Sequence, residues 1–180
     1  KSVLPPVRVS VNISPRQLET ADFVGSVLRA LEANQLEPGV LELEITENVL
    51  MRDVESNAAK LTQLAEAGVL LAVDDFGTGY SSLKYLSRFP IHTLKIDRAF
   101  VKDSELNGMS IANAIVGMAR NLDLNVIAEG VESIAQLEQL RSLQCSEVQG
   151  YLFGMPMSAQ EATKLLQEQV RGTDEVAKAG

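Results

Sequence analysis

The stretch LLAVDDFGTGYSSL, residues 70–83, decides the fold and carries the most telling chemistry. Its apolar start predicts a buried strand over residues 69–75. That strand ends in two adjacent carboxylates, Asp74 and Asp75, and a loop follows that contains Gly77 and Gly79. A short helix is then expected over residues 82–87. A strand that passes through a loop into a helix is the unit of α/β proteins, so we expect a largely parallel sheet.

The two adjacent carboxylates repel each other, and this needs an explanation. A bound hard cation such as Mg²⁺ or Mn²⁺ would offset the repulsion, because such ions prefer oxygen ligands. An acidic, solvated turn explains the same residues, since Asp and Gly are common in turns. This stretch alone does not decide between the two interpretations.

Composition narrows the function classes. The chain has 180 residues, enough for one domain with a sizeable core, and no apolar run is long enough to cross a membrane. A net charge of −8 disfavours binding to a nucleic acid polymer but not to a small phosphorylated ligand. The single cysteine, Cys145, excludes an internal disulfide and favours a reducing compartment. Because the chain opens on Lys1, we expect a piece of a longer protein.

Strands and helices are expected to alternate along the whole chain. We predict strands over residues 7–14, 40–46, 69–75, 93–97, 125–129 and 147–152. Helices are expected after each strand, the last of them over residues 159–170, with a frayed tail over 171–180. No linker divides the chain, so residues 1–170 are expected to form one domain.

This alternation is compatible with two architectures. An open doubly wound sheet and part of a (β/α)₈ barrel both contain successive β/α units. A complete barrel needs about 250 residues, so six units would leave this chain two units short.

Polar residues recur at or near the carboxyl ends of all six predicted strands. In parallel α/β folds these ends lie on one face, where ligands bind. The residues concerned are Asn12, Glu44, Asp74 with Asp75, Lys95, Glu129 and Gln149. Each of them could instead be a turn residue, a helix-start residue or part of a surface pair, but all six alternatives would have to hold together.

The expected site is rich in oxygen ligands. Four carboxylates and an amide could hold two hard cations a few ångströms apart, an arrangement that clamps a phosphodiester and activates water. Asp74 would bridge the two ions, because Asp75 beside it can reach the second. Lys95 would orient the attacking water or offset negative charge in the transition state. The only histidine, His92, and Cys145 give no zinc site, and no P-loop is present.

Six motifs in order resemble one family. They are residues 11–14 (VNIS), 44–47 (EITE), 74–83 (DDFGTGYSSL), 94–97 (LKID), 128–132 (AEGVE) and 149–153 (QGYLF). Together they closely resemble the EAL domain, the bacterial cyclic-di-GMP phosphodiesterase module, over about residues 7–166. One such motif would be weak evidence, whereas six in sequence are specific.

The resemblance implies a TIM-like (β/α)₈ barrel of EAL type, here about six of its β/α units. It implies hydrolysis of cyclic-di-GMP to linear pGpG with two Mg²⁺ or Mn²⁺ ions. It assigns metal ligation to Asn12, Glu44, Asp74, Asp75 and Glu129, with Lys95, Glu129 and Glu47 catalytic and Gln149 contacting substrate. It also assigns to Glu47 the clamping of a switch loop formed by Phe76, Gly77, Thr78 and Gly79.

One departure from the family is important. The Glu-Ala-Leu motif that names the family does not occur in this sequence, and its glutamate is a metal ligand. We therefore expect this chain by itself to be inactive. The alternative function is an inactive EAL domain that binds cyclic-di-GMP as a sensor or serves as a scaffold.

The resemblance also implies partners and a location. It implies a homodimer through the EAL domain, fused sensory or diguanylate-cyclase domains in the parent protein, and no membrane contact by this domain. The bacterial cytoplasm is the expected location, although missing segments could anchor the parent to a membrane.

Overall fold

The computed structural model describes residues 7–79, 86–102 and 106–178. The helix expected over residues 82–87 falls almost wholly outside this range. The chain divides into two compact units, one of residues 8–153 and one that contains the last helix. The strands of the described residues and all the candidate site residues lie in the first unit.

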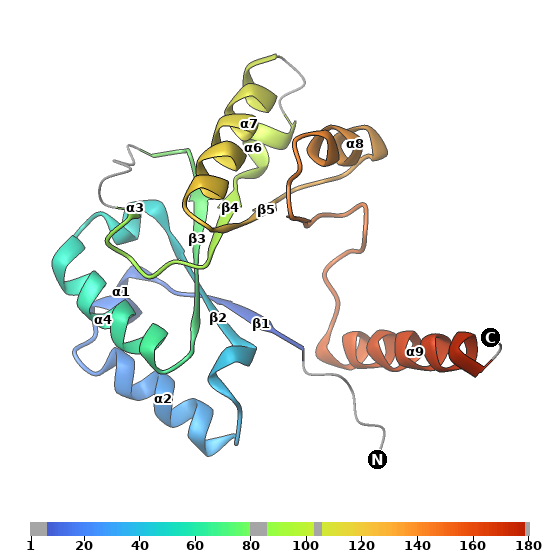
Figure 1. Cartoon of the computed structure of the whole chain (residues 1–180). Helices are drawn as coiled ribbons and strands as arrows, with labels where there is room; N and C mark the ends of the chain where they lie inside the picture. Colours follow the sequence, from blue (N-terminus) through green and yellow to red (C-terminus); the bar gives the residue numbers. More distant parts are fainter. Residues whose placement is uncertain (1–6, 80–85, 103–105, 179–180) are drawn as a thin grey trace. The chain divides into compact units, whose positions relative to one another are not determined.

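Six parallel strands form one sheet whose strand order follows the sequence (Figure 1). They are β1 (Val9–Asn12), β2 (Leu41–Thr46), β3 (Leu70–Phe76), β4 (Thr93–Ile96), β5 (Asn125–Ala128) and β6 (Glu147–Val148). A doubly wound sheet would reverse its strand order at a switch point, and this sheet does not. The sheet instead curls as part of a TIM-like barrel, which resolves the alternative that the sequence left open.

Helices cover the convex face of the curled sheet (Figure 1). The longer ones are α2 (Phe23–Ala33), α4 (Val54–Glu66), α7 (Leu106–Asn121) and α8 (Ile134–Ser142). The shorter ones are α1 (Pro15–Glu19), the 3₁₀ turn η1 (Pro38–Val40), α3 (Glu47–Leu50) and α6 (Arg98–Lys102). Right-handed crossovers between consecutive parallel strands place all connecting helices on the same side.

Helix starts agree with the capping residues in the sequence. The Ser14 side chain accepts a hydrogen bond from the Gln17 amide and begins α1, and Asp53 does the same for α4 through the Ser56 amide. The Asp22 side chain makes no such bond at the start of α2. Helices α3 and α6 were not predicted, because four or five residues are too few to establish a helical period.

Alternation along the strands separates the apolar core from the polar interior of the curl. Leu43, Ile45, Leu71, Val73 and Leu94 are at most 2% exposed and belong to the hydrophobic core. The residues between them point to the opposite face, because successive side chains of a strand alternate. That concave face carries the charged residues discussed below.

The two edge strands are shorter than predicted. Strand β1 spans only Val9–Asn12 and is exposed along its length, and β6 is only Glu147–Val148. Two residues after β6, only glycine fits at position 150, because a Cβ there would lie 2.1 Å from the Val131 carbonyl oxygen. Among the described residues each edge strand has one neighbour only, so fewer ladder hydrogen bonds extend it.

The second unit contains one long helix, α9 (Ala159–Lys178). Its start is fixed by a reciprocal pair, in which Glu161 accepts from the Ser158 amide and Ser158 accepts from the Glu161 amide. The helix continues beyond Val170, where the sequence led us to expect its end. Within the described part of the chain, no helix combines the length and apolarity that a bilayer span requires.

Candidate functional site

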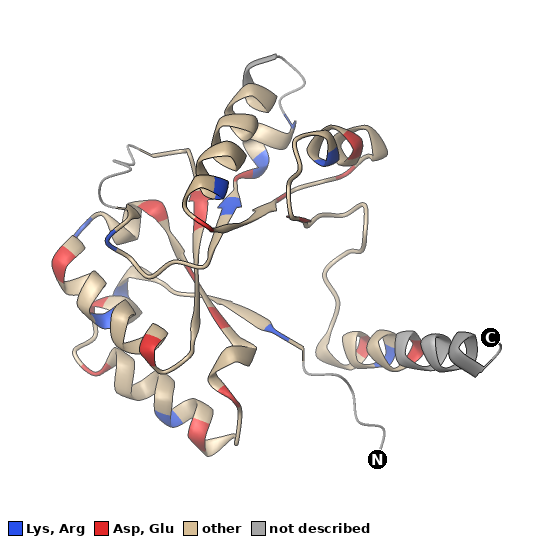
Figure 2. Cartoon of the chain, viewed as in Figure 1, with Lys and Arg blue, Asp and Glu red and all other residues tan. Residues whose placement is uncertain are grey.

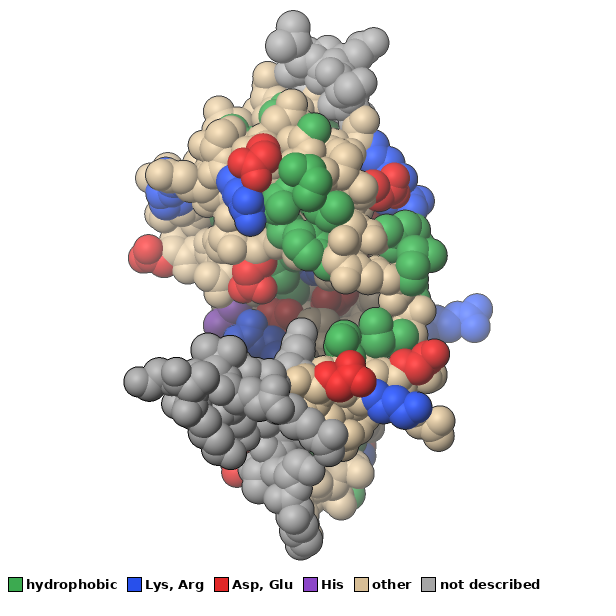
Figure 3. Space-filling view, turned by 90° about the vertical axis from the view of Figure 1, so that its right-hand side faces the viewer, with side chains coloured by type: hydrophobic (Ala, Val, Ile, Leu, Met, Phe, Trp, Pro, Cys, Tyr) green, Lys and Arg blue, Asp and Glu red, His purple; other side chains and the backbone are tan. Residues whose placement is uncertain are grey.

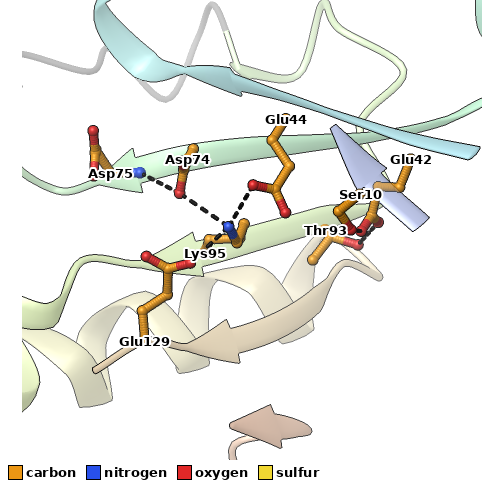
Figure 4. Close-up of polar contacts among 8 residues, drawn as sticks. All are labelled: Ser10, Glu42, Glu44, Asp74, Asp75, Thr93, Lys95 and Glu129. Carbon is orange, nitrogen blue, oxygen red and sulfur yellow. Dashed lines mark hydrogen bonds and ion pairs between the residues drawn. The ribbon is translucent and has the colours of Figure 1, made fainter. Parts of the chain in front are cut away.

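Lys95 lies at the centre of the candidate site (Figure 4). Its Nζ is 2.7 Å from Glu44 Oε2, 2.6 Å from Glu129 Oε1 and 3.4 Å from Asp74 Oδ1. These four side chains come from β2, β3, β4 and the residue that follows β5. The structure therefore brings together four of the residues that the sequence places at strand ends, and it excludes a surface pair of Lys95 with Asp97, because Lys95 is only 4% exposed.

The register of the sheet explains this convergence. Asn12 is opposite Glu44, and Glu44 is opposite Ala72, two residues before Asp74. Residues two apart on a strand share a face, so Glu44, Asp74 and Lys95 all point into the curl. Because the small side chain of Ala72 lies between Glu44 and β4, it leaves room for Glu44 to reach Lys95 across β3.

The two shortest contacts of Lys95, with Glu44 and Glu129, also affect the pKa values of Lys95 and Glu129. Burial alone would lower the pKa of Lys95, but its hydrogen bonds to Glu129 and Glu44, with the charges of Glu129 and Asp74, raise it above the ordinary lysine value. Burial raises the pKa of Glu129, and the hydrogen bond from Lys95 opposes that shift. Lys95 is therefore held as an ammonium, able to donate hydrogen bonds and unable to accept a proton.

Asp75 reaches the same edge of the sheet through an irregular backbone. In a regular strand Asp75 would point to the opposite face from Asp74. Instead, Asp75 has a φ of 53°, and the register of β3 against β4 shifts between Val73 and Phe76. Asp is one of the few residues that tolerate this left-handed conformation, and such irregularities next to active sites redirect side chains.

The neighbours of Asp75 are other carboxylates. Burial, a hydrogen bond with Asp97 and the negative charges of Asp74, Asp97 and Glu129 raise the pKa of Asp75 to about 6. A hydrogen bond between two carboxyl groups requires that one of them holds a proton, which is why the contact with Asp97 raises the pKa of Asp75. Asp97 was not among the predicted site residues, although it belongs to the LKID motif of residues 94–97.

Glu47 lies under the loop that follows β3. Its Oε2 accepts a hydrogen bond from the Gly77 amide at 3.0 Å, and its side chain is 2% exposed. A Cβ on Gly79 would lie 2.4 Å from Glu47 Oε1, so a larger residue there would displace this carboxylate. Within the described residues Oε1 has no hydrogen-bond partner. The loop is thus packed tightly on Glu47, while residues 80–83 of the same motif lie outside the described range.

The loop residues themselves are well anchored at their start. Phe76 is 4% exposed, and Thr78 Oγ1 donates a hydrogen bond to the Asp75 carbonyl oxygen at 2.8 Å. Gly77 has a φ of 97°, which favours glycine, and a Cβ there would lie 3.0 Å from the Phe100 ring. The loop therefore leaves β3 in a conformation that both glycines make possible.

Asn12 and Gln149 lie at the margin of the site. Asn12 ends β1 on the same face as Glu44, and its side chain is exposed. Gln149 follows β6 and lines a pocket of about 210 Å³ with Glu129, Arg98 and Lys102. Glu129 therefore faces both the Lys95 cluster and this pocket, and Gln149 lines this pocket and a second one of about 430 Å³ with Ser10 and Glu42.

Charge is concentrated at the strand ends. Figure 2 shows acidic residues on several strands of the sheet, where a single lysine meets them. The face seen in Figure 3 differs, because acidic, basic and apolar side chains are interspersed on it. The candidate site thus combines several carboxylates with one ammonium group, whereas charges of both signs are mixed on the face in Figure 3.

The donor atoms of the site suit hard divalent cations. Glu44, Asp74, Asp75 and Glu129 offer carboxylate oxygens, and burial together with neighbouring negative charges, which a cation would offset, raises the pKa of Asp75. Three of these carboxylates, those of Glu44, Asp74 and Glu129, contact the Lys95 ammonium group, however. Among the described residues no group of three or more acidic, histidine or cysteine side chains is arranged to hold a metal ion. The carboxylate oxygens are thus suitable ligands for a divalent cation, whereas their spacing in this structure is set by contacts with the Lys95 ammonium group.

Comparisons with known proteins agree on one family. The sequence profile described as "EAL domain" matches residues 1–156. The chain is 46% identical over 155 residues to the bifunctional diguanylate cyclase/cyclic di-GMP phosphodiesterase MucR of Pseudomonas aeruginosa, covering 85% of this chain and 23% of that protein. It is 48% identical over 153 residues to the cyclic di-GMP phosphodiesterase NbdA of the same organism, covering 84% and 20%. The chain thus spans less than a quarter of the length of these relatives.

Solved structures show the same similarity. The PaMucR phosphodiesterase in complex with c-di-GMP has a TM-score of 0.84 at 45% identity, covering 86% of this chain and 64% of that one. The manganese/cyclic-di-GMP complex of Klebsiella pneumoniae BlrP1 has a TM-score of 0.78 at 32% identity, covering 85% and 40%.

Proposed function

The chain belongs to the EAL domain family, and from this premise we propose that it forms the greater part of a metal-dependent site that hydrolyses cyclic-di-GMP to linear pGpG. The observation that carries the proposal is the convergence of Glu44, Asp74 and Glu129 on the buried Lys95. A phosphodiesterase needs both negative ligands and a fixed cation within reach of one phosphate group.

Metal ligation is the first part of the proposal. Asn12, Glu44, Asp74, Asp75 and Glu129 would hold two Mg²⁺ or Mn²⁺ ions, with Asp74 as the bridging ligand. Such ions lower the pKa of water and offset the charge of the phosphodiester. The manganese complex of BlrP1 supports divalent metal use in this family.

Lys95 and Glu129 have complementary roles in the proposal. An ammonium group can only donate hydrogen bonds, so Lys95 orients the attacking water and stabilises negative charge as it develops on the phosphate. Glu129 lies 2.6 Å from Lys95, so a water oriented by Lys95 is within reach of a carboxylate that can accept its proton.

Substrate contact and loop control complete the site. Gln149, in the pocket that contains Glu129 and Arg98, would contact the dinucleotide, because the guanidinium of Arg98 suits a phosphate. Lys102 in the same pocket is paired with Glu132 at 2.7 Å. Glu47 would act on Asp75 through the loop, since it fixes Gly77 two residues later. Fusion to further domains in a longer protein is part of the proposal, and MucR is an example of such a protein.

The test is the activity of the longer protein that contains this chain. Purified protein is incubated with cyclic-di-GMP in Mg²⁺ or Mn²⁺, with an EDTA-treated sample as control, and the products are separated by chromatography with mass detection. We expect pGpG only in the metal-containing samples. Failure to form pGpG with either metal would contradict the proposal.

A binding-only domain is the second candidate, because no three acidic, histidine or cysteine side chains among the described residues are arranged to hold a metal ion. Tight binding of cyclic-di-GMP by calorimetry in EDTA, without turnover when metal is restored, would establish a sensor in place of an enzyme.

A further inference from the structure

A second polar layer lies beneath the Lys95 cluster, inside the same curl (Figure 4). Glu42 on β2 is 2% exposed, and both of its oxygens are occupied. Oε2 accepts a hydrogen bond from Ser10 Oγ on β1 and Oε1 accepts one from Thr93 Oγ1 on β4, each at 2.9 Å. The Arg8 guanidinium is 4.0 Å from Oε1. One carboxylate therefore links three strands.

This layer has a regular relation to the candidate site. Ser10, Glu42 and Thr93 precede Asn12, Glu44 and Lys95 by two residues on the same three strands. Residues two apart share a face of the strand and lie about 7 Å apart along it. A displacement of any of these strands at the lower layer therefore moves a site residue in the upper layer.

The hydrogen bond between Glu42 and Thr93 links β2 directly to β4, which backbone hydrogen bonds cannot do. Strands β2 and β4 are not neighbours, because β3 lies between them. The ladder between β3 and β4 is also irregular beyond Val73, just where Asp74 and Asp75 lie. A direct side-chain link from β2 to β4 thus fixes the curvature of the sheet at the point where Glu44 must reach Lys95.

Stability alone is a poor explanation for this carboxylate. Burying a charge costs free energy that its partners only offset, and well-packed apolar residues often stabilise as much or more. Two hydroxyl donors with a distant, half-exposed arginine satisfy Glu42 without an evident gain. A polar link of fixed length is a better explanation, because hydrogen bonds are directional and apolar contacts are not.

We propose that Glu42, held by Ser10 and Thr93, is a positioning residue that sets the approach of β2 to β4 and thereby the contact between Glu44 and Lys95. The proposal rests on the proposed function for its effect on catalysis. Its structural content, the dependence of the Glu44–Lys95 contact on Thr93, does not need that function.

The kinetic test uses the longer protein at saturating metal. Thr93→Val removes the hydroxyl and keeps the shape, Thr93→Ser restores the hydroxyl, and Glu42→Gln keeps the size but weakens both bonds. Asp53→Ala is the control, because it removes a carboxylate that caps α4 on the outer surface and costs stability. Steady-state kcat and KM are measured with the Tm of each variant.

We expect Thr93→Val to lower kcat roughly tenfold or more, since small displacements in an active site have large kinetic effects. The change in KM should remain within about threefold, Glu42→Gln should be intermediate, and Thr93→Ser should recover most of the rate. Asp53→Ala should lower Tm and leave kcat unchanged. If Thr93→Val lowers Tm but keeps kcat within about twofold, the layer is merely structural and the proposal is wrong.

A crystal structure of the Thr93→Val variant separates this proposal from the proposed function. We expect the Glu44 Oε2–Lys95 Nζ separation to increase beyond hydrogen-bond range from its present 2.7 Å. An unchanged contact would overturn the positioning role whether or not the parent protein is active. If the parent forms no pGpG, only the proposed function fails, and the crystallographic result still decides the role of Glu42.

Discussion

At the scale of single residues, charge balance is the main property of this protein. Lys95 is buried among three carboxylates and remains protonated, because its hydrogen bonds to Glu129 and Glu44 outweigh the cost of burial. Asp75 shares a hydrogen bond with Asp97 under the influence of the same negative charges. Three carboxylates around one ammonium group leave the cluster with an excess of negative charge.

The first prediction concerns Asp74, the proposed bridging ligand. Asp74→Asn in the longer protein should lower hydrolysis of cyclic-di-GMP by about 100-fold or more, because a neutral amide replaces a charged ligand. The matched control is Asp53→Asn, since asparagine is as good a helix cap as aspartate and should leave both rate and Tm unchanged. A rate of Asp74→Asn near that of the parent would refute the two-metal assignment.

The second prediction concerns Cys145. Burial raises the pKa of its thiol, and its Sγ donates to the Glu147 carbonyl oxygen at 3.3 Å. A raised pKa leaves less thiolate at a given pH, and only the thiolate reacts with disulfide reagents. At pH 8 the folded chain should react with a chromogenic disulfide much more slowly than the urea-unfolded chain. Cys145→Ser gives the background, and equal rates in both states would contradict the assigned burial.

At the scale of elements, the end of β3 and the loop after it determine the geometry of the site. The positive φ of Asp75 and the register shift beyond Val73 turn two sequential aspartates toward one edge. Glu47, the first residue of helix α3, lies beneath the loop, where its carboxylate accepts a hydrogen bond from the Gly77 amide. Neither an irregular strand end nor a four-residue helix has a periodic pattern that sequence analysis could detect.

The third prediction tests the Glu47 clamp. Glu47→Ala should increase hydrogen exchange of the Gly77 amide roughly tenfold or more, because a hydrogen bond to a charged group is lost. Exchange is followed by mass spectrometry on a peptide that covers residues 76–79. Glu55→Ala, at an exposed position on α4, is the control and should leave that peptide unchanged. Unchanged exchange in Glu47→Ala would mean that the loop is held by other contacts.

At the scale of the whole molecule, the six strands form an incomplete curl with two edges. Strand β1 pairs with β2 alone among the described residues, and Val9 and Val11 on it are 56% and 40% exposed. A largely apolar groove of about 460 Å³ lies beside it, lined by residues of β1, β2 and α2. An exposed apolar edge strand is a template for pairing with another chain.

The fourth prediction follows from this edge. The 180-residue chain expressed alone should self-associate, and its mass by light scattering should rise with concentration. Val9→Lys should reduce the association, because a charge on an edge strand opposes pairing. Ile134→Lys, a similar change at a 62% exposed position on α8, should not. A monomeric chain at all concentrations, or equal effects of both variants, would show that the β1 edge is not responsible.

The sequence alone determined the alternation of strands and helices, and with it the parallel sheet with polar residues at its strand ends. These follow from short-range patterns, because an apolar run of four to seven residues or a capping residue acts within one element. The motifs around Asn12, Glu44, Asp74, Lys95 and Glu129 also gave the family, which the comparisons confirm.

Only the tertiary structure decided how those residues meet. It chose the barrel curl over the doubly wound sheet, brought Asp97 to Asp75, and placed Glu42 against both Ser10 and Thr93. Each of these contacts joins residues from different strands, and the last crosses β3 entirely. Strand order, curvature and an irregular register depend on the packing of the whole sheet, so no local pattern in the sequence can specify them.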